Sequence, residues 1–246
     1  MTVGMSLELD RVRLSYNDVP VIGGLSLVVG PEEILVLTGP SGCGKSTVLR
    51  ALAGLLRPDE GRVLADGVEV TTTSGDRGMV FQDNALLPWR SVRSNIELAL
   101  RLRGEPRATR RAQAERWIVE VGLTGFGDYL PKSLSGGMRQ RVQLARGLAG
   151  APRAVMMDEP FGALDTQTRA AMQRLLIDTW RVHPTTIVFV THDVDEALAL
   201  GDRIVVMGRA GQPLRAVLDV PEPRSGGARA ELRAEVIAAL DHSVAA

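Results

Sequence analysis

Between an apolar run and a helical pattern, the chain reads Gly39-Pro40-Ser41-Gly42-Cys43-Gly44-Lys45-Ser46-Thr47. This is the G-x-x-x-x-G-K-[ST] pattern in its required context, because the run at 34–38 predicts a buried strand. Its glycines let consecutive backbone N–H groups point at phosphate oxygens at the positive end of the next helix. We therefore expect the whole stretch to bind a nucleotide, with Lys45 on the phosphates and Ser46 as a Mg²⁺ ligand. An ordinary glycine-rich turn is the alternative.

Cys43 lies inside this loop and is the only cysteine of the 246 residues, so an intramolecular disulfide is excluded. It is close to Lys45 and to a helix N-terminus, an electropositive environment that favours the thiolate. We nevertheless favour a small filler residue with no catalytic role.

The rest of the chain alternates apolar runs with helical patterns. Runs at 78–81, 154–157 and 186–191 are apolar on both faces, as in buried parallel strands, so we predict an α/β fold with a P-loop nucleotide hydrolase core. Segments 7–14 and 25–29 alternate apolar and polar residues and predict an N-terminal antiparallel β layer.

The sequence also predicts how the chain is divided. We expect one domain over 1–220, with a helical insertion at about 88–151, where helical patterns occur without a strand run. Breaker residues near 221 predict a tail, 221–246, with a short helix. One face of this helix is expected to dock on the core through Leu232, Val236, Ile237 and Leu240.

Two carboxylates end one of the predicted strands, in Met157-Asp158-Glu159-Pro160. Ligands of open α/β folds lie at this edge of the sheet, which suits Asp158 for holding Mg²⁺. Glu159 can then orient or deprotonate the attacking water. Taken alone, such a pair is more often a solvated turn or a helix cap, but the phosphate loop in the same chain reverses this preference.

A second loop enters a helix at Ser135-Gly136-Gly137-Met138. Its backbone N–H groups form another potential phosphate nest. An ordinary helix start would look similar, so this stretch is weak by itself.

Taken together, these motifs are similar to those of the ATP-binding subunits of ABC transporters over residues 7–207. The resemblance implies ATP and Mg²⁺ as ligands, and Glu159, Gln82 and His192 as catalytic groups. Gln82 would also reach Mg²⁺, and His192 the γ-phosphate. Asp165 would form the D-loop, and Tyr16 would stack on adenine, where a strand-face tyrosine is the alternative reading.

Met138 and Gly162 depart from residues common in the family, Gln or Glu and Ser respectively. Both variants, and the segment from Gln82 to Trp89, resemble the importer branch for nitrate, sulfonates and taurine. The resemblance therefore implies import of a small solute of this kind. An exporter or lipid-moving ATPase, or a soluble ABC ATPase acting as an assembly module, remains the alternative.

The resemblance also implies partners. A head-to-tail homodimer would hold each ATP between the phosphate loop of one copy and Ser135, Gly136 and Gly137 of the other. A separate membrane permease would contact Leu87 and Trp89, although Trp89 could equally be a core residue of the helical insertion. An extracytoplasmic solute-binding protein would act indirectly, and the chain would lie peripherally at the cytoplasmic face of the cell membrane.

The composition argues against two classes of protein, nucleic-acid binders and membrane-spanning proteins. The 29 Lys and Arg residues balance 29 Asp and Glu residues, so no global field would draw the chain to nucleic acid or to an anionic membrane. We therefore expect no nucleic-acid partner. No stretch approaches the roughly 20 apolar residues that a membrane helix needs.

Overall fold

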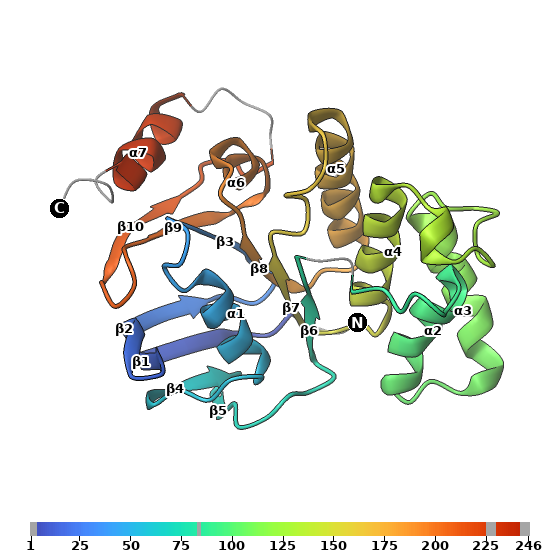
Figure 1. The fold of residues 1–246 in the computed structure, drawn as a ribbon, viewed down its shortest axis with the longest axis horizontal. Coiled ribbons are helices and arrows are strands. Elements are labelled where there is room, and N and C mark those ends of the chain that lie inside the picture. Colours follow the sequence, from blue (N-terminus) through green and yellow to red (C-terminus); the bar gives the residue numbers. More distant parts are fainter. Residues whose placement is uncertain (1–3, 83–84, 225–229, 242–246) are drawn as a thin grey trace.

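The computed structural model describes residues 4–82, 85–224 and 230–241, which build two sheets and the helices that pack on them (Figure 1). The larger sheet has six strands in the order β10-β9-β3-β8-β7-β6. Neighbouring strands are parallel, except that β10 runs antiparallel to β9. The strands are β3 (Ile34–Thr38), β6 (Arg77–Val80), β7 (Ala154–Asp158), β8 (Thr186–Val190), β9 (Arg203–Met207) and β10 (Leu214–Asp219).

The smaller sheet confirms the antiparallel layer expected near the N-terminus. Its four strands have the order β2-β1-β4-β5 and pair antiparallel. They are β1 (Leu7–Tyr16), β2 (Val19–Val29), β4 (Glu60–Ala65) and β5 (Val68–Glu69). The sequence did not predict β4 and β5, because β4 buries only Val63 and Ala65 and β5 is exposed.

Side chains of β3 point alternately to the two faces of the larger sheet, and the main core is accordingly divided into two parts. Leu35 and Leu37 face the core that contains the small sheet and α1 (Lys45–Ala53), whereas Ile34 and Val36 face the core of α5 (Thr166–Val182) and α6 (Val194–Leu200). Both faces of the parallel sheet are thus covered, as its doubly apolar strands require. The α/β prediction is confirmed.

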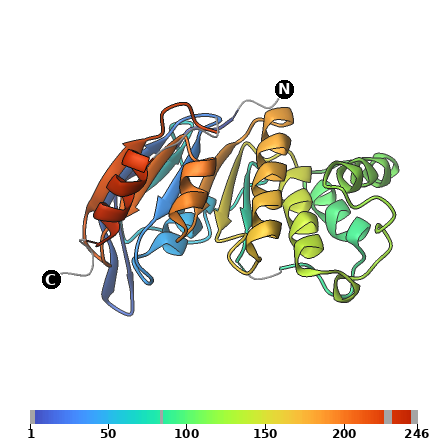
Figure 2. The ribbon, with the colours of Figure 1, turned by 90° about the horizontal axis from the view of Figure 1, so that it is seen from above.

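Between β6 and β7 the chain forms only helices among its described residues. These are α2 (Val92–Leu102), α3 (Arg107–Glu120), the short 3-10 helix η1 (Pro131–Ser133) and α4 (Gly136–Ala149). Seen from above, α2 and α3 lie at one end of the molecule and α7 (Ala230–Asp241) at the other (Figure 2). The helical region has its own apolar cluster around Ile96, Ile118 and Val142.

Helix α7 docks on the core as expected. Val236 is buried, and Leu232 and Leu240 pack against the same cluster, while Ile237 is only partly buried. The boundaries of domain and tail stay predictions. Within the described ranges, no helix has the length and apolar character needed to cross a membrane.

Candidate nucleotide-binding site

The loop between β3 and α1 has a backbone that only glycine accommodates easily. Gly44, at the N-cap of α1, has φ +103°, and a Cβ there would lie 2.6 Å from Ile22 Cδ1 and 2.9 Å from Val21 Cγ1. Gly42 also has positive φ, at +77°. These angles curl the chain before α1, so the free N–H groups of the first helical turn face the loop.

Lys45 is held inside this curl. It is 8% exposed, and its Nζ donates to Gly39 O at 2.8 Å and Pro40 O at 3.1 Å. These carbonyls keep the ammonium in place without neutralising its charge. A phosphate oxygen entering the loop would find that charge already positioned.

Asp158, the last residue of β7, lies against the phosphate loop. Ser46 Oγ donates to Asp158 Oδ1 at 3.0 Å, joining α1 to the carboxyl end of β7. Burial raises the pKa of Asp158, and the hydrogen bond from Ser46 opposes this in part. Hard oxygen donors of this kind suit Mg²⁺, which binds through few protein groups and takes its other ligands from phosphates and water. Among the described residues, no three His, Cys, Asp or Glu side chains are placed so that they could hold a metal ion together, so any Mg²⁺ there would depend on such outside ligands.

Glu159 is positioned by a left-handed backbone. Its φ is +40°, in a region that costs a non-glycine residue on the order of 1–3 kcal/mol. Two bonds hold this conformation: Glu159 N donates to Val190 O at 3.1 Å, and Gly162 N donates to Glu159 O at 3.1 Å. The turn directs the carboxylate away from β7 and toward the edge where the phosphate loop begins.

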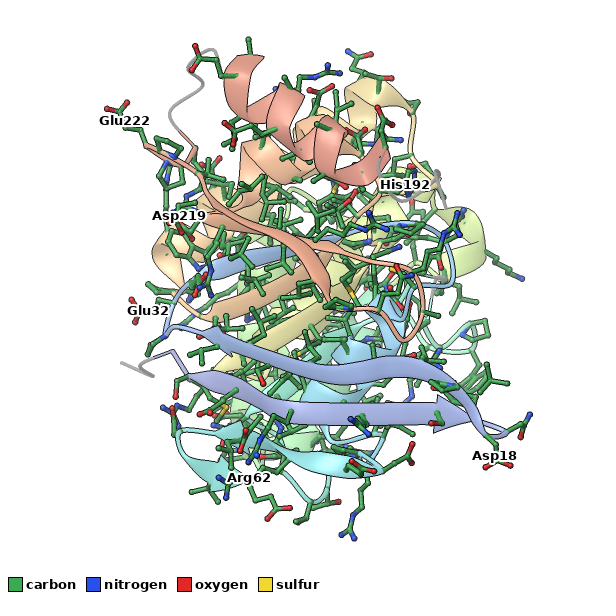
Figure 3. All side chains as sticks on the ribbon, turned by 90° about the vertical axis from the view of Figure 1, so that its left-hand side faces the viewer. Asp18, Glu32, Arg62, His192, Asp219 and Glu222 are labelled. Carbon is green, nitrogen blue, oxygen red and sulfur yellow. The ribbon has the colours of Figure 1, made fainter. Side chains whose placement is uncertain are left out.

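The other two predicted catalytic residues, Gln82 and His192, contact the Glu159 carboxylate. Glu159 Oε2 lies 3.1 Å from His192 Nδ1 and accepts from Gln82 Nε2 at 3.4 Å. Gln82 follows β6 and His192 follows β8, so three strand ends converge. In Figure 3, His192 lies on the opposite side of the molecule from Glu32, which precedes β3, as expected for the two ends of parallel strands.

A cavity of about 630 Å³ joins these groups to the loop. Tyr16 enters its lining from the end of β1 with its side chain partly exposed, a position open to an adenine ring. Val21 also lines the cavity. The sequence analysis did not predict this, because nothing in the sequence distinguishes this valine from the other apolar strand residues. The complete lining is Tyr16, Val21, Ser41, Gly42, Gly44, Lys45, Ser46, Thr47, Gln82, Glu159 and His192.

Other predicted residues lie outside this lining. Ser135 is the N-cap of α4 and accepts from Met138 N at 3.3 Å, with Gly136 and Gly137 opening the helix. Asp165 is the N-cap of α5 and accepts from the backbone N–H of Thr168 at 3.0 Å. Their roles toward a nucleotide stay predictions.

Of the two interpretations of Cys43, the structure favours the small filler residue over the thiolate. The side chain is 2% exposed and lies beneath the loop, 3.9 Å from Lys45 Nζ. Burial raises the pKa of the thiol, and the attraction of Lys45 only partly opposes this. Cys43 is therefore a neutral packing residue, and contact with a nucleotide could come only from its backbone.

The two residues expected to meet a permease differ in exposure. Trp89 is 73% exposed, so the reading of it as a core residue is wrong. Leu86, which is 6% exposed, takes that place instead. Leu87 is partly buried, and its N–H donates to Asn95 Oδ1 at 2.9 Å.

A glycine-rich phosphate loop with a converging acid, glutamine and histidine defines a nucleotide-binding α/β protein. Residues 22–162 match the family model described as ABC transporter. The chain is 45% identical over 232 residues to an uncharacterized ABC transporter ATP-binding protein of Methanocaldococcus jannaschii, covering 93% of this chain and 87% of that one. The chain belongs to the ABC transporter ATP-binding family.

Further comparisons agree with the expected branch and fold. The chain is 44% identical over 237 residues to the taurine import ATP-binding protein of Chromobacterium violaceum, covering 88% of this chain and 91% of that one. A dimeric cassette structure bound to ADP and Pi matches with TM-score 0.76 and 28% identity, over 87% of this chain and 98% of that one. The resemblance to the taurine-type branch and the P-loop ABC ATPase fold are thus confirmed.

Proposed function

We propose that this ATP-binding subunit is a Mg²⁺-dependent ATPase that powers import of a small sulfonate-, nitrate- or taurine-like solute through a separate permease. The observation that carries the ATPase proposal is the placement of the Glu159 carboxylate between Gln82 and His192 at the mouth of the phosphate loop. Relatives that are taurine import ATP-binding proteins support the solute class.

Hydrolysis needs a water aligned with the γ-phosphorus and a group that accepts its proton. The Glu159 carboxylate is the acceptor in this proposal, and Gln82 orients the same water. The Lys45 ammonium balances charge that develops on the phosphate oxygens. Mg²⁺, held by Ser46, Asp158 and Gln82, would supply further charge neutralisation.

One copy supplies only part of the expected contacts, so we propose a head-to-tail homodimer. The Ser135 loop lies outside its own chain's cavity and would cover the ATP of the partner. Dimeric cassette structures among the relatives support this arrangement. Binding of ATP would then close the pair, and hydrolysis would remove the contact that keeps it closed.

The permease is proposed to receive this motion at Leu87 and Trp89. Trp89 offers a large exposed aromatic surface, of the kind enriched at interfaces. It lies in the segment that follows Gln82, so nucleotide state and permease contact share one stretch of chain. The protein would lie at the cytoplasmic face of the membrane, with a solute-binding protein acting on the other side.

The experiment compares Glu159→Gln with wild type, with and without Mg²⁺. Glutamine keeps the shape and removes the base, so turnover should fall by about 10²–10⁴-fold. ATP binding should persist, and light scattering should detect an ATP-dependent dimer. Glu120→Gln, a carboxylate that pairs with His183 outside the cavity, is the matched control. Persistent hydrolysis in Glu159→Gln, or ATP binding only as a monomer, would contradict the proposal.

A further inference from the structure

Arginines gather around a second cavity, of about 400 Å³, in the helical region. It lies at α2 and α3, the end of the molecule remote from α7 (Figures 1 and 2), and shares no lining residue with the nucleotide cavity. The lining is Arg90, Glu97, Leu98, Arg101, Arg107, Arg110 and Arg111, which we call the arginine cavity. Five positive charges thus face one carboxylate.

Glu97 is the one carboxylate in this lining, and it leaves four of the five positive charges unbalanced. Within the described ranges, none of the five arginine side chains makes a hydrogen bond or ion pair, although Arg111, after Arg93, helps to lower the pKa of Asp128. Three other acids of the helical region have partners of their own. Arg93 forms ion pairs with Glu115 and with Asp128, and Glu105 accepts from Gln113 Nε2 at 2.9 Å. The positive charge is therefore left for something outside the chain.

The start of α3 adds to this charge. The helix begins at Arg107 after Pro106, with no acidic residue in its first turn and no side-chain cap. Basic residues at this end are unfavourable toward the helix dipole. The local backbone thus reinforces the positive potential of the arginine cavity.

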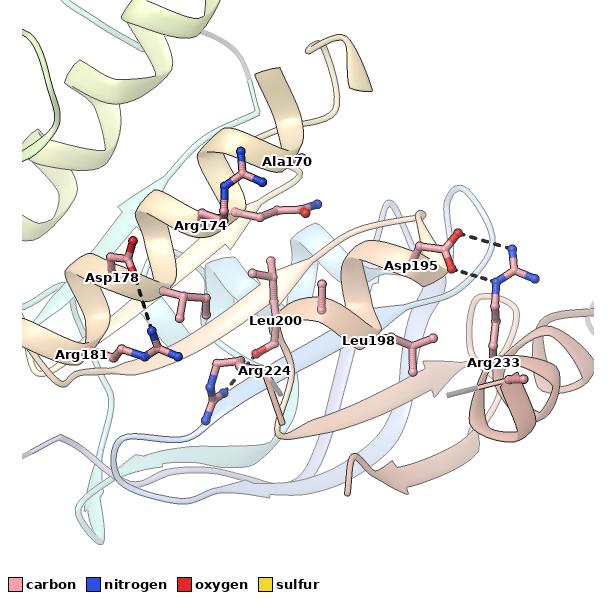
Figure 4. A pocket seen from close by; sticks show the side chains of 13 residues that line it. Ala170, Arg174, Asp178, Arg181, Asp195, Leu198, Leu200, Arg224 and Arg233 are labelled. Carbon is pink, nitrogen blue, oxygen red and sulfur yellow. Dashed lines mark hydrogen bonds and ion pairs between the residues drawn. The ribbon is translucent and has the colours of Figure 1, made fainter. Parts of the chain in front are cut away.

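Abundant arginine does not by itself leave guanidinium groups unpaired. A larger cavity, of about 680 Å³, lies between α5, α6 and the start of α7 (Figure 4). At its rim Arg233 pairs with Asp195 at 2.8 Å, and Arg181 pairs with Asp178 at 3.4 Å. Arg224 pairs with Asp202 at 2.6 Å. The arginine cavity has no such pairing.

We infer that the arginine cavity binds an anion that carries two or more phosphate groups. Guanidinium groups bind phosphate through paired N–H donors, and several positive charges around one cavity favour a multivalent anion over a monovalent one. The volume fits a small ligand. A soluble diphosphate and the two-phosphate headgroup of a lipid share this chemistry.

In the test, sodium pyrophosphate is titrated into the full chain and binding is measured by titration calorimetry. The chain is first saturated with Mg²⁺ and a non-hydrolysable ATP analogue, so that the phosphate loop is filled. A parallel arm measures co-sedimentation with phosphatidylcholine vesicles with and without cardiolipin. Binding of about one pyrophosphate per chain assigns a soluble ligand, and cardiolipin-dependent sedimentation assigns a lipid.

Variants locate the binding. The double variant Arg107→Gln with Arg111→Gln should weaken binding by about tenfold or more for each arginine removed. Arg101→Gln repeats the test on α2. The control is Arg116→Gln with Arg174→Gln, which makes the same charge change outside the arginine cavity. Since ATP turnover does not enter the readout, failure here is separate from failure of the proposed function.

The inference is overturned if neither pyrophosphate nor cardiolipin vesicles bind. It is also overturned if the control pair loses as much affinity as the cavity pair, because binding would then reflect overall charge. Removing mutually repelling charges should leave the variants folded, and thermal melts of each variant check this.

Discussion

Glycines lie at the starts of both α1 and α4, yet the surroundings of the two loop-to-helix junctions differ. The first loop encloses Lys45, hydrogen-bonds through Ser46 to Asp158, and lines a cavity with Glu159. The second loop has Ser135 capping its own helix and lies outside that cavity. Glycines before a helix therefore provide donors, whereas buried charge and converging acids make a reaction site. In the proposed dimer, the second loop would act on the nucleotide that the other copy holds.

Mixing two inactive variants tests most directly whether the two loops act on the same ATP from different copies of the chain. Lys45→Ala should lose ATP binding and Ser135→Arg should block the partner's site, so each alone should be inactive. If the loops act across the dimer, a mixed dimer regains one intact site. Random mixing should then restore about a quarter of wild-type turnover, because half of the dimers are mixed and each has one working site.

Mixing Lys45→Ala with itself at the same total concentration is the control. If the mixture of the two variants stays as inactive as this control, while light scattering detects dimers, both loops act within one chain. The comparison between the loops would then need another explanation.

His192 gives the next largest effect, and His183 offers a matched comparison. His192 contacts Glu159, whereas His183 pairs with Glu120 at 3.0 Å and stacks on Trp117 away from the nucleotide cavity. His192→Ala should lower turnover by about 10²-fold with little change in ATP affinity. His183→Ala should leave turnover unchanged. Equal turnover in the two variants would show that His192 does not contribute to hydrolysis.

Asn95 connects the chain after Gln82 to the helical region that carries the second loop. It is fully buried, and its Nδ2 donates to Leu87 O at 3.2 Å and Arg90 O at 3.0 Å. Asn95→Ala removes the side-chain partner of Leu87 N and of Arg90 O and should cost about 2–4 kcal/mol of unfolding free energy. Urea denaturation measures this, with the 75% exposed Leu102→Ala as control. A change no larger than that of Leu102→Ala would show that this connection is not stabilising.

The sequence predicted those features that depend on local patterns. Buried parallel strands carry continuous apolar runs, and the phosphate loop needs its residues in fixed order, so both could be found. The exposure of Trp89 and the pairing of the arginines could not, because they depend on which segments pack together. Glu159 shows both cases. Its proposed role as a base was predicted from its position after a strand, but its left-handed backbone conformation was not.

Cys43 is where the structure decides between two interpretations of the sequence, and it gives the smallest expected effect. Proximity to Lys45 suggested a thiolate, yet desolvation outweighs that attraction and raises the pKa of the thiol. At pH 7 the native thiol should therefore react with maleimide far more slowly than free cysteine, and faster as pH rises or urea unfolds the chain. Cys43→Ala should alter ATP affinity little, since the cavity is lined by its neighbours. Rapid native labelling at pH 7 that ATP prevents would mean that the loop opens before nucleotide binds, so that the charge of Lys45 governs the thiol after all.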